Sequence, residues 1–139
     1  MTDGLEALAR RAVACPRWRW TPGMVAVTAC LDYSDDADPA ALIAARVVDV
    51  SGGAIACFVP RQAMPLVTAA ERAIPDLSDP ATVGCLLALV RGAWEDDCMH
   101  AEPEHDAWRV WRRIYPMGVA GIGATEEEAL VAALEAAPC

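Results

Sequence analysis

The sequence predicts an α+β fold: a mostly antiparallel sheet of four or five strands with three helices on both of its faces, forming a three-layer sandwich. Apolar residues recur at helical spacing in three segments, and β-branched runs lie between them. Two of those runs are apolar at successive positions: MVAVTACL (24–31) and AIACFV (54–59). A strand with one face in solvent instead alternates apolar and polar residues. We therefore expect both faces of these strands to be covered, and residues 1–139 to form a single domain.

The first predicted elements are a helix over residues 2–14 and a strand over 24–31. Thr2 has the side chain of an N-cap, and apolar residues follow it at helical spacing. Pro16 ends this helix, because proline disfavours the helical conformation of the residue before it. The acidic stretch DYSDDADP, residues 32–39, then predicts a solvated loop.

A β-hairpin is predicted next. The runs ARVVDV (45–50) and AIACFV (54–59) have the composition of strands, and the Ser-Gly-Gly of 51–53 between them is typical of a tight turn. The following segment, 61–75, carries apolar residues between two prolines and predicts a short helix.

The strongest helical pattern starts at Asp79. Asp79 has an N-cap side chain, Pro80 suits the first helical position, and the apolar stripe continues to Trp94. A short strand over 98–101 and a longer one over 107–115, AWRVWRRIY, are predicted after this helix. The arginines in 107–115 favour the edge of the sheet, where strands commonly carry charge.

The last predicted element is a helix that starts after Thr125. The stretch MGVAGIGA, residues 117–124, is predicted as a loop. Thr125 and Glu128 form the T-x-x-E pattern of a capping box. Apolar residues then recur at helical spacing until Pro138, which lies just past the helix.

Composition limits the functional classes. The chain carries 11 basic residues, all arginine, against 20 acidic ones, and the net charge of -9 argues against general nucleic-acid binding. A hydrophobic content of 55% excludes a disordered acidic tail. No apolar run reaches the roughly 20 residues of a membrane span, and the N-terminus shows no secretory signal. We therefore expect a cytoplasmic protein without membrane partners, whose six cysteines are free thiols.

Three sequence blocks together resemble a known group of proteins. They are LEALARRAVACPRWRWTPGM (5–24), PDLSDPATVGCLLALVRGAWED (75–96), and TEEEALVAALEAAP (125–138) after the strand that begins AWRV (107–110). The chain resembles small bacteriophage and prophage proteins of uncharacterised function, some of them grouped as a phage helix-sheet-helix (ABA) sandwich domain. The resemblance implies a phage origin, the cytoplasm of a host cell and this approximate fold. It implies no catalytic residues, and it leaves residues 32–74 unmatched.

The first candidate site combines arginine with tryptophan in two segments, the loop after the first helix and one face of the strand 107–115. The candidate residues are Arg17, Trp18, Arg19, Arg109, Trp111 and Arg113. Guanidinium and indole groups together bind phosphates and bases, and they also dominate protein interfaces. The alternative is that the indoles belong to the core and the arginines extend into solvent. We expect this alternative for Trp18, Trp20 and Trp108, while both interpretations stay open for Trp111.

A metal site is the second candidate. Cys98, His100 and His105 have the spacing C-x-H-x4-H and acidic neighbours, and zinc accepts thiolate, imidazole and carboxylate ligands. However, this spacing matches neither paired C-x-x-C motifs nor H-E-x-x-H. The sequence therefore favours a solvated acidic turn, and it predicts no metal and no other cofactor.

Two further patterns are weak indications of chemistry. Gly118, Gly121 and Gly123 precede the last helix, whose N-terminus could hold an anion, but the glutamates that open this helix would repel phosphate. No pairing of a nucleophile with a base is evident except Cys98 near His100. We therefore predict no catalytic residues.

Acidic residues cluster in 32–38, in 95–106 and in the last helix. Such charge keeps a small protein soluble, or it imitates a nucleic-acid backbone towards a basic cleft. We expect a small phage-encoded, non-enzymatic binding protein with a counter-defence role, which blocks a host immune protein or sequesters a small nucleotide. A virion-accessory or structural phage protein is the alternative, and a metal-dependent enzyme is less favoured. The partner would be a host or phage protein or a nucleotide ligand, and an unpaired edge strand would allow a homodimer.

Overall fold

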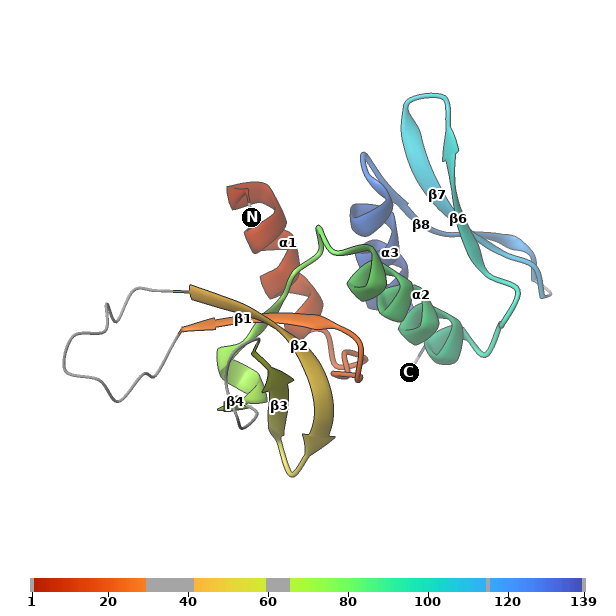
Figure 1. Cartoon of the computed structure of the whole chain (residues 1–139). Coiled ribbons are helices and arrows are strands. Elements are labelled where there is room, and N and C mark those ends of the chain that lie inside the picture. The colour runs from red at the N-terminus through yellow and green to blue at the C-terminus, as the bar shows by residue number, and fades with distance from the viewer. Residues whose placement is uncertain (1, 30–41, 60–65, 115, 139) are drawn as a thin grey trace.

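The computed structural model describes residues 2–29, 42–59, 66–114 and 116–138. It confirms the α+β class, with three helices and a five-stranded antiparallel sheet, and it shows a second antiparallel sheet of three strands. In Figure 1 the helices lie between the two sheets, whereas the sequence indicates one sheet with helices on both faces. The predicted acidic loop 32–39 lies outside the described residues.

The first sheet has the strand order β4-β3-β2-β1-β5. Its strands are β1 (Val25–Ala29), β2 (Leu42–Ser51), β3 (Ala54–Phe58), β4 (Leu66–Ala69) and β5 (Ile74–Pro75). Gly52 and Gly53 have φ angles of 56° and 79°, so they form the predicted turn between β2 and β3 without strain. The register of β2 on β3 shifts between Val47 and Asp49, a bulge that bends β2.

The predicted short helix over 61–75 is wrong for the part of it that the structure describes, 66–75. This part contains β4 and β5, with a single 3₁₀ turn, η1 (Ala70–Arg72), between them. β4 pairs with β3, where Thr68 lies opposite Ile55, and β5 pairs with β1. A stretch this short, bounded by prolines, does not sustain a stable helix, and pairing with the sheet satisfies its backbone instead.

Each helix begins at its predicted capping residue. The helices are α1 (Asp3–Ala14), α2 (Pro80–Trp94) and α3 (Glu126–Glu135). The side chains of Thr2, Asp79 and Thr125 accept hydrogen bonds from the backbone N–H three residues further on, at 3.4, 2.8 and 3.3 Å. Glu128 Oε2 accepts from the Ala124 N–H at 2.7 Å and so links α3 to the strand before it. No helix in the described part of the chain is long and apolar enough to cross a membrane.

The second sheet has the strand order β6-β7-β8. Its strands are β6 (His100–Glu104), β7 (Ala107–Arg112) and β8 (Gly118–Gly123). β6 starts two residues later than the predicted strand 98–101, because a turn closed by the Met99 N–H and Asp96 O precedes it. The predicted edge position of 107–115 is wrong, because β7 lies in the centre of this sheet.

Neighbouring side chains accommodate the charges of β7 at this central position. Arg109 Nε lies 2.9 Å from Glu104 Oε2 of the adjacent strand. The Arg112 guanidinium lies 4.6 Å from the ring centroid of Trp94, a cation–π contact with the end of α2. Arginine therefore does not restrict this strand to an edge, since each of these two side chains has a specific partner.

The predicted loop 117–124 is also wrong, because it contains β8. Three of the six residues of β8 are glycine, which lowers strand propensity and hides the strand in the sequence. A Cβ added at Gly121 would lie 2.3 Å from Ala129 O of α3, and one added at Gly123 would lie 2.5 Å from Ala129 N. α3 therefore packs directly on the backbone of β8 and covers this face of the second sheet.

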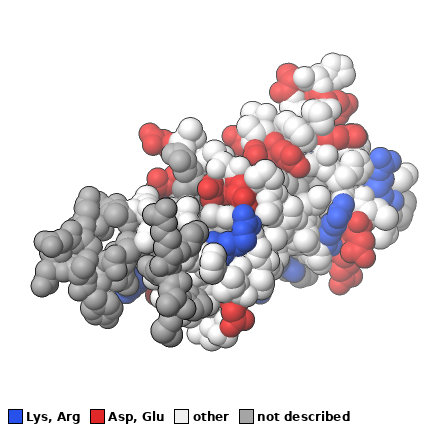
Figure 2. Space-filling model, in the orientation of Figure 1, with Lys and Arg blue, Asp and Glu red and all other residues white. Residues whose placement is uncertain are grey.

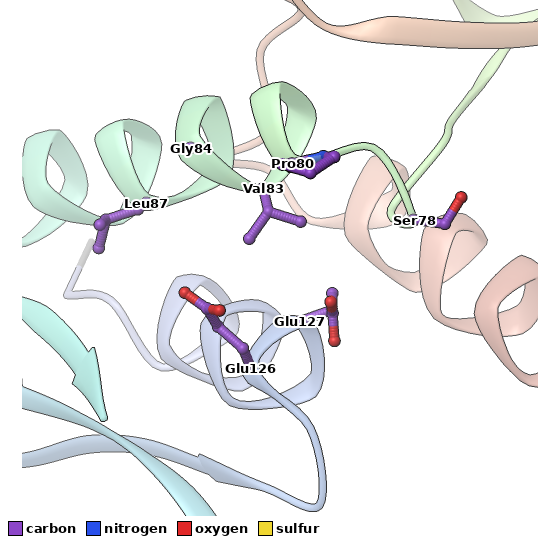
Figure 3. Close-up of a pocket in the computed structure, with 7 residues that line it drawn as sticks. All are labelled: Ser78, Pro80, Val83, Gly84, Leu87, Glu126 and Glu127. Carbon is purple, nitrogen blue, oxygen red and sulfur yellow. The ribbon is translucent and has the colours of Figure 1, made fainter. Parts of the chain in front are cut away.

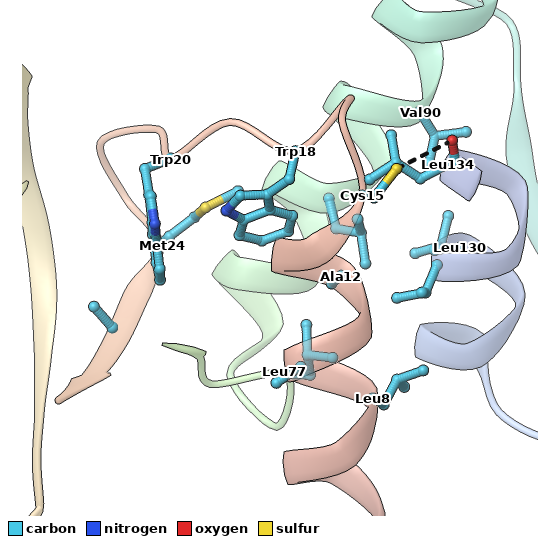
Figure 4. Packing of buried hydrophobic residues seen from close by; sticks show 14 of the residues in the cluster. Leu8, Ala12, Cys15, Trp18, Trp20, Met24, Leu77, Val90, Leu130 and Leu134 are labelled. Atoms are coloured by element: carbon cyan, nitrogen blue, oxygen red, sulfur yellow. Dashed lines mark hydrogen bonds between the residues drawn. The ribbon is translucent and has the colours of Figure 1, made fainter. Parts of the chain in front are cut away.

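The hydrophobic core connects the helices at the centre of the molecule (Figure 4). Leu8 and Ala12 of α1 face Leu130 and Leu134 of α3, and Val90 of α2 completes the contact. Leu8 is 5% exposed and the other four are fully buried. The core continues from this helical layer to the inner faces of both sheets.

Four cysteines are free thiols, as predicted: Cys15, Cys57, Cys85 and Cys98. Cys15 Sγ lies 3.7 Å from Leu134 O (Figure 4), and burial raises the pKa of the Cys57 thiol. Both residues therefore act as small apolar core residues. Cys30 and Cys139 lie outside the described residues.

Replacing Leu130 with alanine is expected to lower the free energy of unfolding by about 3 kcal/mol, because the change removes a fully buried side chain and leaves a cavity. Met117→Ala is the matched control: this side chain is 72% exposed, so the change is expected to stay below about 0.5 kcal/mol. Urea denaturation followed by circular dichroism measures both variants. Equal midpoints would contradict the placement of Leu130 in the core.

Candidate binding surfaces

The aromatic residues of the first arginine–tryptophan segment lie in the core. Trp18 and Trp20 are 7% and 9% exposed, and their rings meet edge to face with centroids 5.5 Å apart. Trp20 Nε1 donates to Ala70 O at 3.3 Å. The predicted alternative, indoles in the core, therefore applies to both residues, and Trp18 offers little surface for stacking.

The arginines of this segment bind backbone carbonyls nearby. Arg17 donates to Pro138 O beyond α3, and Arg19 donates to Pro16 O at 2.9 Å and to Trp18 O at 2.6 Å. A hollow of about 490 Å³ lies beside them. Its lining is apolar apart from one arginine and one glutamate: Val13, Ala14, Trp18, Arg19, Trp20, Val50, Ala70 and Glu71. With one charge of each sign, it has no net charge that would attract a phosphate.

The second arginine–tryptophan segment lies on an open face. In the register of the sheet, Arg109 is opposite Glu102 and Ile122, and Trp111 is opposite His100 and Val119. Gly121, next to Ile122, contacts α3, so these side chains point away from the helix. We call this surface the Trp111 face, formed by His100, Glu102, Glu104, Arg109, Trp111, Arg113, Val119 and Ile122.

Arg109 and Trp111 lie on the same side of the second sheet, as the alternation of residues along the strand predicts. Trp111 is half-buried in its middle strand, and Ile122 is 54% exposed beside it. Arg113 Nη2 lies 3.4 Å from His100 Nε2, which brings this arginine to the same surface. The first segment lies against the helices and Pro138, so the second sheet separates the two predicted segments.

Asp96 holds the end of the Trp111 face in place, although the sequence indicates only a solvated acidic cluster. Its side chain is buried and accepts three backbone hydrogen bonds, from Cys98, Arg113 and Ile114, at 3.0, 2.9 and 3.0 Å. The N–H groups of Ile114, Arg113 and Cys98, with the charge of Arg112, hold the pKa of Asp96 below its ordinary value despite burial. Asp96 thereby fixes the chain after β7, where Arg113 begins.

The candidate metal ligands do not converge. His100 Nε2 lies 3.5 Å from Glu102 Oε2, and His100 Nδ1 lies 3.4 Å from the backbone oxygen of Cys98 rather than from its sulfur. His105 lies in the β6–β7 turn with a φ angle of 56°. Among the residues that the structure describes, no three His, Cys, Asp or Glu side chains form a group that could hold a metal ion.

The two glycines nearest to α3, Gly121 and Gly123, leave no space for an anion, because they are packed against this helix. A hollow of about 280 Å³ lies at the N-terminal ends of α2 and α3. Figure 3 shows Glu126 and Glu127 of α3 opposite Val83 and Pro80 of α2. Burial and the charge of Glu127 raise the pKa of Glu126. The glutamates make this hollow unsuitable for phosphate.

Acidic side chains are spread over several elements rather than gathered into one stripe. Figure 2 shows them at the tip of the β6–β7 hairpin and over the helices, with arginines between them. Several are paired: Glu6 with Arg10 and Glu135 with Arg11, both at 2.7 Å. Imitation of a nucleic-acid backbone, which needs a continuous row of charge, therefore receives little support from this face.

The expectation that both faces of the first strands are covered is wrong, because one face of the first sheet is exposed in the described part of the chain. The inner face is buried, but apolar side chains on the opposite, outer face are exposed: Leu42 66%, Val48 47%, Phe58 56% and Val67 65%. A hollow of about 390 Å³ lies on this outer face, lined by Val25, Ala44, Ala45, Arg46, Val48 and Phe58. The non-alternating strands did signal two apolar faces, and the structure covers only one of them.

Comparisons of the chain with models of protein families, with curated proteins and with solved structures find no match.

Proposed function

We propose that this chain is a small non-enzymatic binding protein and that the Trp111 face docks a protein partner. The observation that supports this is the placement of half-buried Trp111 between Arg109 of the same strand and exposed Arg113 just after it, on a strand held by neighbours on both sides. Tryptophan and arginine are the residues most enriched in the energetic centres of protein interfaces. A paired central strand also holds them rigidly, which lowers the entropy cost of binding.

The charges of the Trp111 face favour a protein over a nucleotide. Arg109 is already paired with Glu104, and His100 lies beside Glu102, so little positive charge remains for a phosphate. The apolar side chains of Val119 and Ile122 extend the surface beyond the charged groups. Mixed charge around an aromatic centre is typical of protein–protein interfaces. The partner we propose, a bacterial host protein, follows from the resemblance of the sequence to phage proteins.

The test is capture from a bacterial lysate by immobilised wild-type chain, followed by affinity measurement with the identified partner. We expect Trp111→Ala and Arg109→Ala to weaken the affinity for that partner at least about tenfold each, because each removes a central contact. Arg10→Ala is the control, since Arg10 is an exposed arginine of α1 that pairs with Glu6 of the same helix. Circular dichroism confirms that each variant is folded.

Two results would contradict the proposal. One is a partner whose affinity is unchanged by Trp111→Ala and Arg109→Ala. The other is a thermal shift of wild-type chain with cyclic or ADP-ribose-type nucleotides that both variants abolish, which would assign the face to nucleotide capture.

A further inference from the structure

The outer face of the first sheet carries exposed apolar side chains along the strands that the structure describes. On the inner face, Ala45, Val47, Ile55 and Cys57 are at most 4% exposed. On the outer face, the exposed apolar side chains come from three adjacent strands, β2, β3 and β4. Contiguous apolar surface of this kind is uncommon in monomeric proteins and marks an interface.

The charge of the outer face is balanced. Across the five strands the only charged side chains are Arg46 and Asp49. Arg46 is engaged within the molecule, with Asp79 Oδ1 at 3.3 Å and with Gly23 O. This face therefore has no concentration of charge that would attract a strongly acidic or strongly basic partner. A second copy of the same face is equally apolar, and the two charges that its strands carry, Arg46 and Asp49, are of opposite sign, so the contact has no net charge.

The outer face carries an exposed aromatic side chain at the rim of a hollow. Phe58, 56% exposed, stands on β3 beside the hollow of about 390 Å³ that Val25, Ala44 and Val48 line. A twofold axis that runs parallel to the sheet, in the plane of the contact, turns the outer face of one copy onto that of the other, so each Phe58 can enter the hollow of the opposite copy. The closed symmetry leaves no free surface that would continue the association.

The area of the outer face is sufficient for a specific but moderate contact. With strands about 4.8 Å apart and a rise of about 3.4 Å per residue, five strands offer about 400 to 500 Å² per copy. The total for two copies is about 800 to 1,000 Å², which is the size of weak and transient interfaces. A dimer with a dissociation constant in the micromolar range is therefore expected.

We infer that the outer face of the first sheet is a homodimer interface, in which two copies of this chain pack their five-stranded sheets face to face. The two sheets then form a sandwich about 10 Å apart. This mode uses the face of the sheet, not the edge strand that the sequence suggests. It also leaves the Trp111 face of each copy free, so the inference stands or fails independently of the proposed function.

Sedimentation velocity of the full chain between about 1 and 200 μM tests the inference. Wild-type chain is expected to move from 14.8 kDa towards twice that mass as the concentration rises. Phe58→Lys and Val48→Lys are each expected to weaken association at least about tenfold, because a charge would face apolar surface. Ile122→Lys, which changes an apolar side chain 54% exposed on the Trp111 face, is the control and should leave association unchanged.

A wild-type chain that stays at 14.8 kDa at the highest concentration would overturn the inference. A dimer disrupted by Ile122→Lys but not by Phe58→Lys would also overturn it. Hydroxyl-radical footprinting of unmodified wild-type chain avoids any folding defect of the variants. Labelling of Phe58 and Val67 is expected to fall between low and high concentration while that of Ile122 stays constant, and unchanged labelling of Phe58 would contradict the dimer.

Discussion

Replacing Gly121 with alanine is expected to lower the free energy of unfolding by about 3 kcal/mol or more, near the upper end for overpacked sites. The new Cβ would lie 2.3 Å from Ala129 O, 2.5 Å from Ala133 N and 2.8 Å from Ala133 Cβ. Two of these atoms belong to the backbone of α3, so rotation of a side chain cannot relieve the contact. The helix would have to move away from the second sheet and open the core on that side.

Gly118→Ala is the matched control, because Gly118 lies in the same strand and a Cβ there meets nothing within 4 Å. Its effect on stability is expected to stay within about 1 kcal/mol of zero. Thermal and urea denaturation measure both variants. If Gly121→Ala were as stable as Gly118→Ala, the close packing of α3 on β8 would be refuted.

Asp96→Asn is the second large effect that we expect. Asp96 Oδ2 accepts from the N–H groups of both Arg113 and Ile114, and Oδ1 accepts from that of Cys98. An asparagine amide supplies one oxygen and one NH₂ group, so a donor would face a donor at a buried position. We expect the thermal midpoint at pH 7 to fall by at least about 5 °C. Asp97→Asn, at the exposed neighbouring position, is expected to change it little.

The difference between wild-type chain and Asp96→Asn depends on pH in a defined direction. The pKa of Asp96 is lowered by folding, so its stabilising contribution is fully present above the unfolded value of about 3.9 and is lost as the pH falls towards the folded value. Urea denaturation at pH 7, 4 and 3 should therefore show the gap between the two proteins narrowing with acid. A gap that widened with acid would show that the carboxylate is not the stabilising form.

Local signals in the sequence predict the helices and the hairpin correctly. Thr2, Asp79 and Thr125 cap the three helices as their side chains indicate, because capping depends on residues three positions apart. The glycines of 52–53 form the hairpin turn for the same reason, since their conformational freedom is a property of single residues. Such interactions are complete within one turn of the chain.

The predictions that fail concern strands whose partners are distant in sequence. β8 is hidden by its glycines, and the need for them arises only when α3 packs onto it. The arginines of 107–115 suggest an edge, yet Glu104 and Trp94 provide partners for Arg109 and Arg112 in the centre of a sheet. The pairing of β4 with β3 likewise overrides the short helical pattern in 61–75.

The candidate sites show the same division. Period-two alternation places Arg109 and Trp111 on one side of a strand, and the register of the second sheet bears this out. Whether a tryptophan is core or surface does not follow from its neighbours in the chain: Trp18 is buried, whereas Trp111 lies on an open face. The apolar character of both faces of the first sheet is evident in the sequence, but which face is covered is not.

Cap chemistry, turn chemistry and hydrophobic period are properties of neighbouring residues, and for this chain they are enough to predict an α+β protein with its three helices and the strands β1, β2 and β3 of the first sheet. The division into two sheets, the burial of Asp96 and the open outer face depend on contacts between segments far apart in the chain. Burial is a property of the whole packed molecule, because the surface that covers a residue comes from elements with no sequence relation to it. The three-dimensional arrangement was therefore required to separate covered apolar surface from surface that is free to bind.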